Sequence, residues 1–152
     1  MQVAVATDHA GFSLKETVIN QLKALGHEVL DFGTHSNERV DFPDFAQRVG
    51  IAIQEQQAER GVLLCGSGIG MCMAANKMVG IRASTAHDTY SAAQGVEHDG
   101  MNVLCLGSRV VGEEVAKTLV TSFMSAELSK EERFHKRINK IIALETEMKT
   151  QK

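Results

Sequence analysis

Short apolar segments alternate with amphipathic segments along almost the whole sequence, and this alternation restricts the fold more than any other feature. Each apolar segment is rich in aliphatic or β-branched residues, which is typical of a buried strand. The five segments are residues 2–7, 28–32, 61–64, 81–84 and 102–106. Strands separated by helices form a parallel sheet with helices on both faces. We therefore predict an α/β fold of three layers, α/β/α, around a five-stranded parallel sheet.

Capping residues and glycines predict where the helices begin and end. The first helix follows a capping box at residues 13–16 and stops near Leu25, before Gly26. Residues 33–43 are polar and contain the only proline, so we expect a loop there. Further helices are expected over residues 44–57, from the glycine turn after Cys65 to about residue 78, over 88–96 with Asp88 as its cap, and over 113–126.

A second capping box at residues 129–132 predicts the start of a charged C-terminal helix. Ile138, Ile141, Ile142 and Leu144 give this helix an apolar face. The face could lie on its own domain or on another chain. We expect it to pack on a partner subunit.

The composition is that of one globular domain spanning residues 1–152, with 43% apolar and 23% charged residues. A net charge of −3 is not typical of a nucleic-acid binder. No segment resembles a membrane span or a signal peptide. Cys65, Cys72 and Cys105 show no CxxC spacing. We therefore expect free thiols, no zinc or other metal site, and a cytoplasmic location.

In an open parallel sheet, ligands bind outside the carboxyl ends of the strands. Three polar segments are expected at this edge: residues 8–11, the glycine turn that begins at Cys65, and the stretch around His98.

The turn over residues 65–70 contains Gly66, Gly68 and Gly70. Such a turn lets backbone N–H groups approach a phosphate or a developing oxyanion. It differs from the dinucleotide fingerprint, because Met71 occupies the third glycine position, and it is neither a Walker A loop nor a GxSxG elbow. The alternative is a close strand-to-helix crossover that binds no ligand.

Cys65 lies between a strand and a helix N-terminus, where the thiolate form is favoured. A thiolate can act as a general base or as a nucleophile. The alternative is a buried core cysteine, which is the interpretation we adopt for Cys72 and Cys105.

Other polar residues leave two interpretations open. Asp8 and His9 could move protons and bind sugar hydroxyls, or Asp8 could only cap the next helix. His98, taken alone, is typical of a surface histidine. Arg133 and Arg137 lie one helical turn apart and could bind a phosphate, or they could belong to a solvated charged face.

Taken together, these segments resemble type B ribose-5-phosphate isomerases, in the superfamily that includes galactose-6-phosphate isomerase subunits. The matching segments are residues 7–11 (TDHAG), 32–34 (FGT), 41–44 (DFPD), 65–70 (CGSGIG), 74–77 (AANK), 80–82 (GIR), 102–104 (NVL) and 107–109 (GSR), with Arg133 and Arg137. They follow one another over almost the whole chain.

The resemblance implies a flavodoxin-like (Rossmann-like) fold and a homodimer whose active sites are shared between subunits. It implies interconversion of ribose 5-phosphate and ribulose 5-phosphate with no metal and no cofactor. Cys65 would move the proton, with Ser67 and the N–H groups of the turn stabilising an enediolate. The assisting groups would be Asp8 and His98 in ring opening, and His9, Asn102, Arg109, Arg133 and Arg137 in substrate and phosphate binding.

Four positions depart from the family pattern: Phe42 replaces a tyrosine, Asp99 an amide, Gly100 a residue with a side chain, and Phe134 a histidine. They leave allose 6-phosphate, galactose 6-phosphate or a tetrose phosphate as alternative substrates. A flavodoxin-like binding module is a further alternative. The turn at residues 8–11 disfavours it, because it is not a Ser/Thr-rich phosphate loop. An inactive dimeric scaffold is disfavoured because it would not need Cys65 and both arginines together.

Overall fold

The computed structural model describes residues 1–147, and its centre is the predicted five-stranded parallel sheet. The strand order is β2-β1-β3-β5-β4, and every neighbouring pair is parallel. The strands are β1 (Gln2–Thr7), β2 (Glu28–Asp31), β3 (Arg60–Cys65), β4 (Ala83–Thr85) and β5 (Val103–Gly107). The chain crosses from one side of β1 to the other between β2 and β3. Because β1, β3 and β5 are adjacent parallel strands, their carboxyl ends lie side by side.

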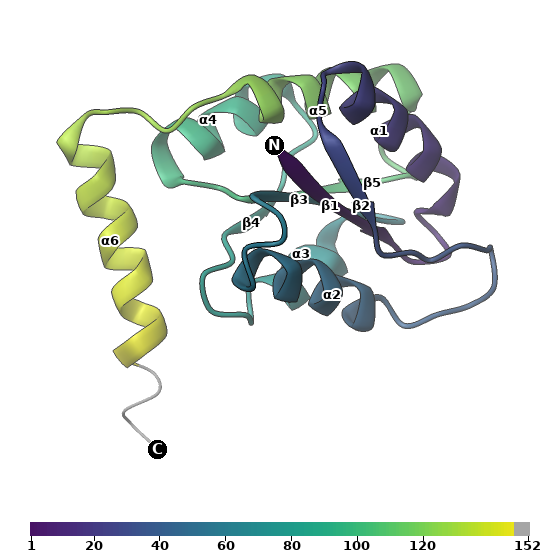
Figure 1. Ribbon diagram of the computed structural model, residues 1–152, viewed down its shortest axis with the longest axis horizontal. Helices are drawn as coiled ribbons and strands as arrows, with labels where there is room; N and C mark the ends of the chain where they lie inside the picture. Colours follow the sequence, from purple (N-terminus) through teal and green to yellow (C-terminus); the bar gives the residue numbers. More distant parts are fainter. Residues whose placement is uncertain (148–152) are drawn as a thin grey trace.

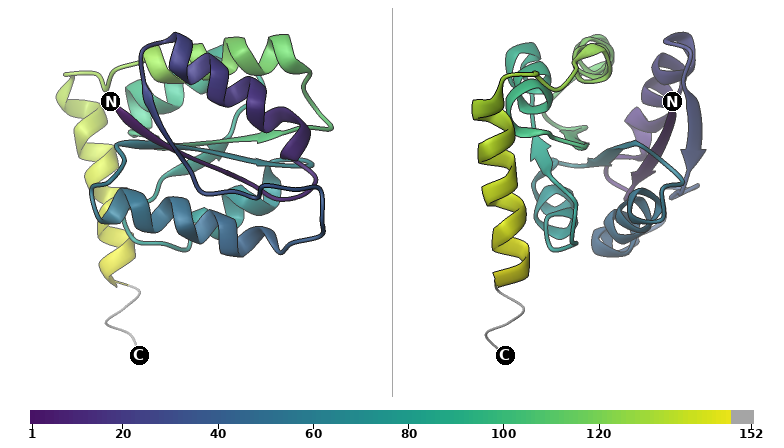
Figure 2. Two further views of the ribbon diagram at one scale, coloured as in Figure 1. Left: turned by 45° about the vertical axis from the view of Figure 1, so that its right-hand side comes forward. Right: turned by 60° about the vertical axis from the view of Figure 1, so that its left-hand side comes forward.

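Helices cover both faces of the sheet, which confirms the three-layer prediction (Figures 1 and 2). One layer holds α1 (Phe12–Ala24), α4 (Thr89–Asp99) and α5 (Glu113–Ser125). The other holds α2 (Phe42–Gln54) and α3 (Ile69–Ala75). The sixth helix, α6 (Glu132–Glu147), follows α5 and lies beside α4 at the side of the domain.

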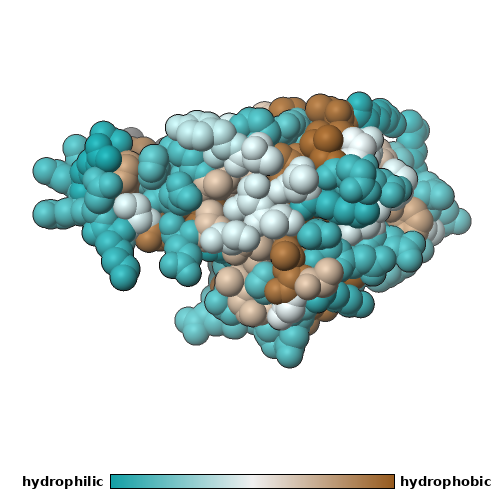
Figure 3. All heavy atoms as spheres, turned by 90° about the horizontal axis from the view of Figure 1, so that it is seen from above, coloured by the Kyte–Doolittle hydropathy of each residue, from teal (hydrophilic) through white to brown (hydrophobic). Residues whose placement is uncertain are grey.

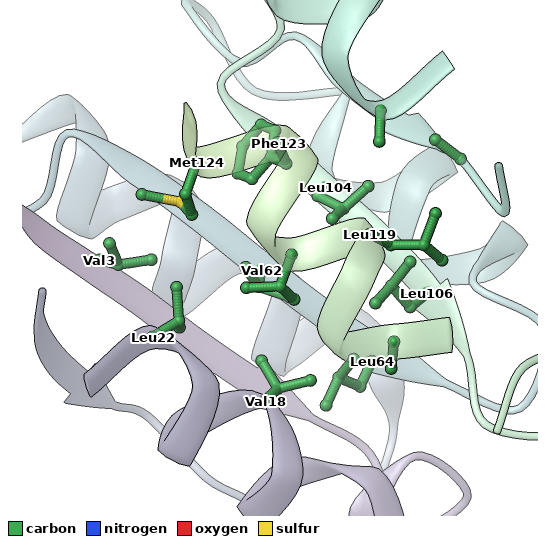
Figure 4. Packing of buried hydrophobic residues seen from close by; sticks show 14 of the residues in the cluster. Val3, Val18, Leu22, Val62, Leu64, Leu104, Leu106, Leu119, Phe123 and Met124 are labelled. Atoms are coloured by element: carbon green, nitrogen blue, oxygen red, sulfur yellow. The ribbon is translucent and has the colours of Figure 1, made fainter. Parts of the chain in front are cut away.

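Alternate side chains of each strand point into two separate cores. Val62 and Leu64 of β3 face α1, α4 and α5, where they meet Leu119 and Phe123 (Figure 4). Leu63, the residue between them, faces α2 and α3. Burial of both sheet faces explains why the central strands are continuously apolar and not alternating.

The ends of the helices differ from the prediction at several places. The capping box at residues 13–16 is wrong, because α1 begins at Phe12 with Gly11 as its N-cap. Gly26, with φ of 84°, does follow the end of α1 as predicted. Pro43, which we expected in a loop, lies in the first turn of α2, where its missing N–H has no helical partner to lose.

Later helices show further differences. α3 ends at Ala75, three residues before the predicted end. The Asp88 cap is confirmed, since its Oδ1 accepts the Ser91 N–H at 2.7 Å, and α4 continues to Asp99. The second capping box is wrong in register: α6 begins at Glu132, and the Ser129 hydroxyl accepts the N–H of Glu131.

α6 packs against α4, and Glu145 near its end accepts the Gly80 N–H at 3.0 Å, so the helix runs along the side of its own domain (Figure 2). Phe134 and Ile138 are buried in this contact. Ile141, Ile142 and Leu144 remain 41%, 40% and 59% exposed. Seen from above, the side of the molecule at which α6 lies is mostly hydrophilic (Figure 3). The apolar face therefore continues beyond the surface that its own domain covers, and its packing on a partner subunit stays a prediction.

None of the helices in the described part of the chain is long and apolar enough to cross a membrane.

Candidate functional site

The carboxyl ends of β1, β3 and β5 border an open cavity of about 500 Å³. Asp8 and His9 line it from the segment after β1, and Arg109 lines it from the segment after β5. Cys65 and Ser67 line it from the turn after β3. The parallel strands thus bring segments that are far apart in sequence together at one edge of the sheet (Figure 1).

Cys65 is 5% exposed and lies at the wall of this cavity. Its Sγ accepts the N–H of Gly68 at 3.0 Å. Gly68 has φ of 81°, a conformation that glycine adopts readily and that turns its N–H toward the sulfur. This hydrogen bond fixes the direction of the sulfur at the cavity wall.

The turn is packed tightly against the end of β5. Ser108 and Arg109 donate their N–H groups to the carbonyls of Cys65 and Gly66, at 2.9 and 3.0 Å. A Cβ on Gly107 would come within 2.6 Å of the Ser67 backbone, so no larger residue fits there. Gly107 is thus needed for the shape of the turn, and the sequence marks it only as part of the matching GSR segment.

His87 supports the same edge, and the sequence analysis missed it. Its Nε2 accepts the N–H of Gly107 at 3.0 Å. Burial lowers the pKa of His87, which keeps the ring neutral and able to accept. No sequence pattern marks His87, because its partner lies 20 residues further along the chain.

Asp8 and His9 have defined hydrogen bonds. Asp8 is 7% exposed, and its Oδ1 accepts the Gly11 N–H at 2.9 Å, as a helix-capping residue would. Its carboxyl group also lines the cavity, so the two interpretations of Asp8 are compatible. His9 Nδ1 accepts the Val40 N–H at 3.3 Å. In a neutral His9 ring the proton is therefore on Nε2, which is free to donate to a ligand.

His98 is not at this edge, so its predicted placement at the carboxyl ends of the strands is wrong. It lies in the last turn of α4, and α4 returns the chain to the amino end of β5. The imidazole stacks on Phe134 of α6 with a centroid distance of 4.0 Å. The guanidinium groups of Arg133 and Arg137 lie 4.5 and 5.8 Å from the centre of the same Phe134 ring.

Asn102 also lies at the amino end of the sheet. Its Oδ1 accepts the Arg82 N–H and its Nδ2 donates to the Gly80 carbonyl, both at 2.8 Å. These two bonds join the segment before β4 to the start of β5.

The predicted residues other than Asn102 therefore form two clusters. We call Asp8, His9, Cys65, Ser67 and Arg109, with the turn glycines, the thiol cluster. We call His98, Phe134, Arg133 and Arg137 the arginine cluster. α6 and the carboxyl ends of the strands are on opposite sides of the domain (Figure 1), so one chain does not bring the two clusters together.

The other two cysteines differ from one another. Cys105 is fully buried, as predicted, and burial raises the pKa of its thiol well above the usual value. Cys72 is only half-buried, which corrects its assignment to the core. A hydrogen bond with Cys105 is the main cause that lowers the pKa of Cys72 to about 6. Cys72 does not line the cavity at Cys65, so it has no access to a ligand there.

Within residues 1–147, no three His, Cys, Asp or Glu side chains are grouped closely enough to hold a metal ion.

Comparison with known proteins gives a consistent result. Residues 3–141 match the sequence profile of the family described as Ribose/Galactose Isomerase. The chain is 41% identical over 144 residues to ribose-5-phosphate isomerase B of Escherichia coli K12, covering 95% of this chain and 96% of that protein. It is 40% identical over 128 residues to D-erythrulose-4-phosphate isomerase of Pectobacterium atrosepticum, covering 84% of each chain.

A solved structure is similar in both fold and sequence. Ribose-5-phosphate isomerase B of Clostridium thermocellum superposes with a TM-score of 0.94 at 40% identity. The match covers 97% of this chain and 99% of that one.

Proposed function

Because the chain belongs to the ribose/galactose isomerase family and is an aldose–ketose isomerase of sugar phosphates, we propose that it interconverts ribose 5-phosphate and ribulose 5-phosphate, with Cys65 as the base. The observation that carries this proposal is the Cys65 sulfur, which accepts a backbone N–H at 3.0 Å at the wall of an open cavity.

The reaction moves one proton between neighbouring carbons. The Cys65 thiolate takes the proton from C2 of the open-chain aldose, and the electron pair of that bond forms the C1–C2 double bond of an enediolate. The resulting thiol returns the proton to C1, while the proton of the C2 hydroxyl moves to the oxygen on C1, so that C2 becomes the carbonyl carbon. No atom is gained or lost, so one side chain of suitable basicity can serve both steps.

Negative charge on the enediolate oxygens needs nearby donors. The glycine turn supplies N–H groups and the exposed Ser67 hydroxyl beside the sulfur. Because the Gly107 contact and two backbone hydrogen bonds hold the turn, these donors are already in place before the charge develops. Ring opening of the sugar is assigned to Asp8 and His98.

Phosphate binding is assigned to four basic residues of both clusters. His9 and Arg109 lie in the cavity, whereas Arg133 and Arg137 lie on α6. His98 lies with these two arginines, and its assigned role also requires contact with the sugar. We propose that the chain forms a homodimer in which the arginine cluster of one copy completes the thiol cluster of the other. The exposed apolar residues of α6 support this arrangement, because a second copy would cover them.

A phosphate anchor far from the reacting carbons contributes to catalysis by fixing their position. Three free thiols are compatible with the proposed cytoplasmic location.

A tetrose phosphate is the second candidate substrate, because Phe42 lines the cavity without the hydroxyl of a tyrosine. A Cβ on Gly70 would meet the Phe42 ring at 3.0 Å, so this ring lies directly against the turn. An apolar ring there gives the sugar no hydrogen bond. The similar Pectobacterium protein is named for a four-carbon substrate.

Turnover of ribose 5-phosphate, followed by proton NMR in D2O, tests the proposal. We expect conversion to ribulose 5-phosphate with deuterium entering the carbon skeleton. Faster turnover of a four-carbon or six-carbon sugar phosphate under the same conditions would contradict the choice of substrate. Conversion without exchange would contradict a proton-transfer mechanism through a solvent-accessible thiol.

A further inference from the structure

Arg39 is a basic residue of the cavity that the sequence analysis did not single out. It lies in the loop between β2 and α2 and lines the cavity beside Cys65. Arg39 also lines a second open cavity of about 320 Å³, together with His9, Val40 and Asp41. His9 and Arg39 border both cavities and therefore stand at their junction.

The loop that carries Arg39 is anchored at its start. The Thr7 N–H donates to the Gly33 carbonyl at 2.6 Å, and the Thr34 N–H donates to the Thr7 carbonyl at 2.7 Å. Lys15 is 8% exposed, and its ammonium group lies 2.8 Å from both Asp31 Oδ2 and the Thr34 carbonyl. A buried ammonium with two anionic or carbonyl partners holds the loop against α1.

The loop is also attached beside Arg39 itself. The N–H of Val40 donates to His9 Nδ1 at 3.3 Å. This bond links the position of the Arg39 backbone to the orientation of the His9 ring. It directs the remaining nitrogen of His9, Nε2, away from the bond and leaves it free to donate.

The guanidinium of Arg39 is not used within the chain. No hydrogen bond or ion pair joins it to any of residues 1–147, although Asp41 lines the smaller cavity with it. Of the acids around the larger cavity, Asp8 already accepts the Gly11 N–H. Arg109 is likewise without an acidic partner there, and it lies across Gly66. The cavity that contains His9 therefore also has two guanidinium groups without an acidic partner, those of Arg39 and Arg109.

We propose that Arg39 binds the phosphate monoester of the substrate, from the same chain that supplies Cys65. A guanidinium offers a planar pair of N–H donors that matches two phosphate oxygens, and here no internal ion pair has to break first. Arg39, Arg109 and His9 then form a phosphate grip within one chain, separate from the arginines of α6. This inference rests on the proposed function, because it takes the ligand of the Cys65 cavity to be a sugar phosphate.

The test compares Arg39→Ala with Arg48→Ala. Arg48 is an exposed arginine of α2 that donates to the Phe32 carbonyl and lies outside both cavities, so it controls for the loss of one positive charge. We expect Arg39→Ala to raise KM for ribose 5-phosphate about tenfold and to change kcat by less than about twofold. Binding of inorganic phosphate, measured by calorimetry, should weaken by a similar factor. Arg39→Lys should recover part of both losses.

Equal KM and equal phosphate affinity for Arg39→Ala and Arg48→Ala would overturn the assignment of Arg39 and leave the proposed function intact. A fall in kcat with KM unchanged would also overturn it. A wild-type protein that binds inorganic phosphate through Arg39 but turns over no sugar phosphate would uphold the anion site and contradict the proposed function.

Discussion

The thiol cluster and the arginine cluster are built in opposite ways. Cys65 is buried, it accepts a backbone N–H, and the turn that carries it is packed against β5. Arg133 and Arg137 stand on an exposed helix that contacts its own domain mainly through α4. Cys65, the assigned base, is thus fixed by the core of one chain, whereas Arg133 and Arg137, two of the assigned phosphate ligands, lie on a surface that we propose a second copy covers. We therefore expect proton transfer to depend on the sheet edge of one chain and part of the phosphate binding to depend on assembly.

The largest effect is expected at the thiol cluster. Cys65→Ala should lower kcat about a thousandfold or more, because it removes the base assigned to the carbon-bound proton. Circular dichroism and thermal unfolding should show that the fold survives, since the change removes a single atom at the cavity wall.

Cys72→Ala is the matched control for this variant. Cys72 has the lowered pKa, but only Cys65 lines the cavity. If Cys72→Ala were the inactive variant and Cys65→Ala remained active, basicity and not position would identify the base, and our assignment would be wrong.

A smaller effect is expected at the arginine cluster. Arg137→Ala should raise KM for ribose 5-phosphate about ten- to a hundredfold with a lesser change in kcat, because a charge-assisted phosphate contact is lost. Lys140→Ala, one turn further along the exposed part of α6, removes a positive charge at a position with no assigned role and should leave KM near the wild-type value. An unchanged KM in Arg137→Ala would take this arginine out of the phosphate site.

The smallest expected effect is on the free energy of unfolding. It concerns His87, which accepts the Gly107 N–H next to the thiol cluster. Burial lowers the pKa of His87 and of His27, so the unfolded chain binds protons at these residues more readily than the folded chain does. Their contribution to stability is complete above about pH 6.5 and is lost as the pH falls below it. Denaturant unfolding between pH 7.5 and 5 should show this decline.

His87→Gln refines the same measurement. A glutamine oxygen can accept the Gly107 N–H without titrating, so the decline in unfolding free energy should be shallower, with the part due to His27 remaining. An equally steep decline in this variant would mean that His87 does not couple protonation to folding.

Elements that follow a strand directly were predictable from the sequence. The turn at residues 65–70 and the segment at residues 8–11 lie where the strand order requires, because a parallel sheet puts all strand ends at one edge. His98 could not be placed in that way, since its position depends on where α4 ends. That end is set by Gly100, which has φ of 64°, and the helix runs three residues further than its apolar pattern predicted.

Side-chain contacts between residues distant in the chain could not be predicted from the sequence either. The Ser13 capping box failed because Asp8, five residues upstream, accepts the Gly11 N–H and starts the helix earlier. Arg39 lay in a stretch that reads only as a polar loop. Its importance emerges from Lys15 and His9, which hold that loop through contacts between segments distant in sequence.

The most direct test of the account mixes two variants that are expected to be nearly inactive at low substrate concentration, Cys65→Ala and Arg137→Ala, after reversible dissociation and reassociation. If the two clusters meet across a dimer, each mixed dimer contains one site with an intact Cys65 from one copy and an intact Arg137 from the other. Random reassortment should then restore about a quarter of the wild-type activity at low substrate concentration. No recovery, in a mixture shown by native mass spectrometry to contain mixed dimers, would mean that each chain completes its own site and would contradict the account.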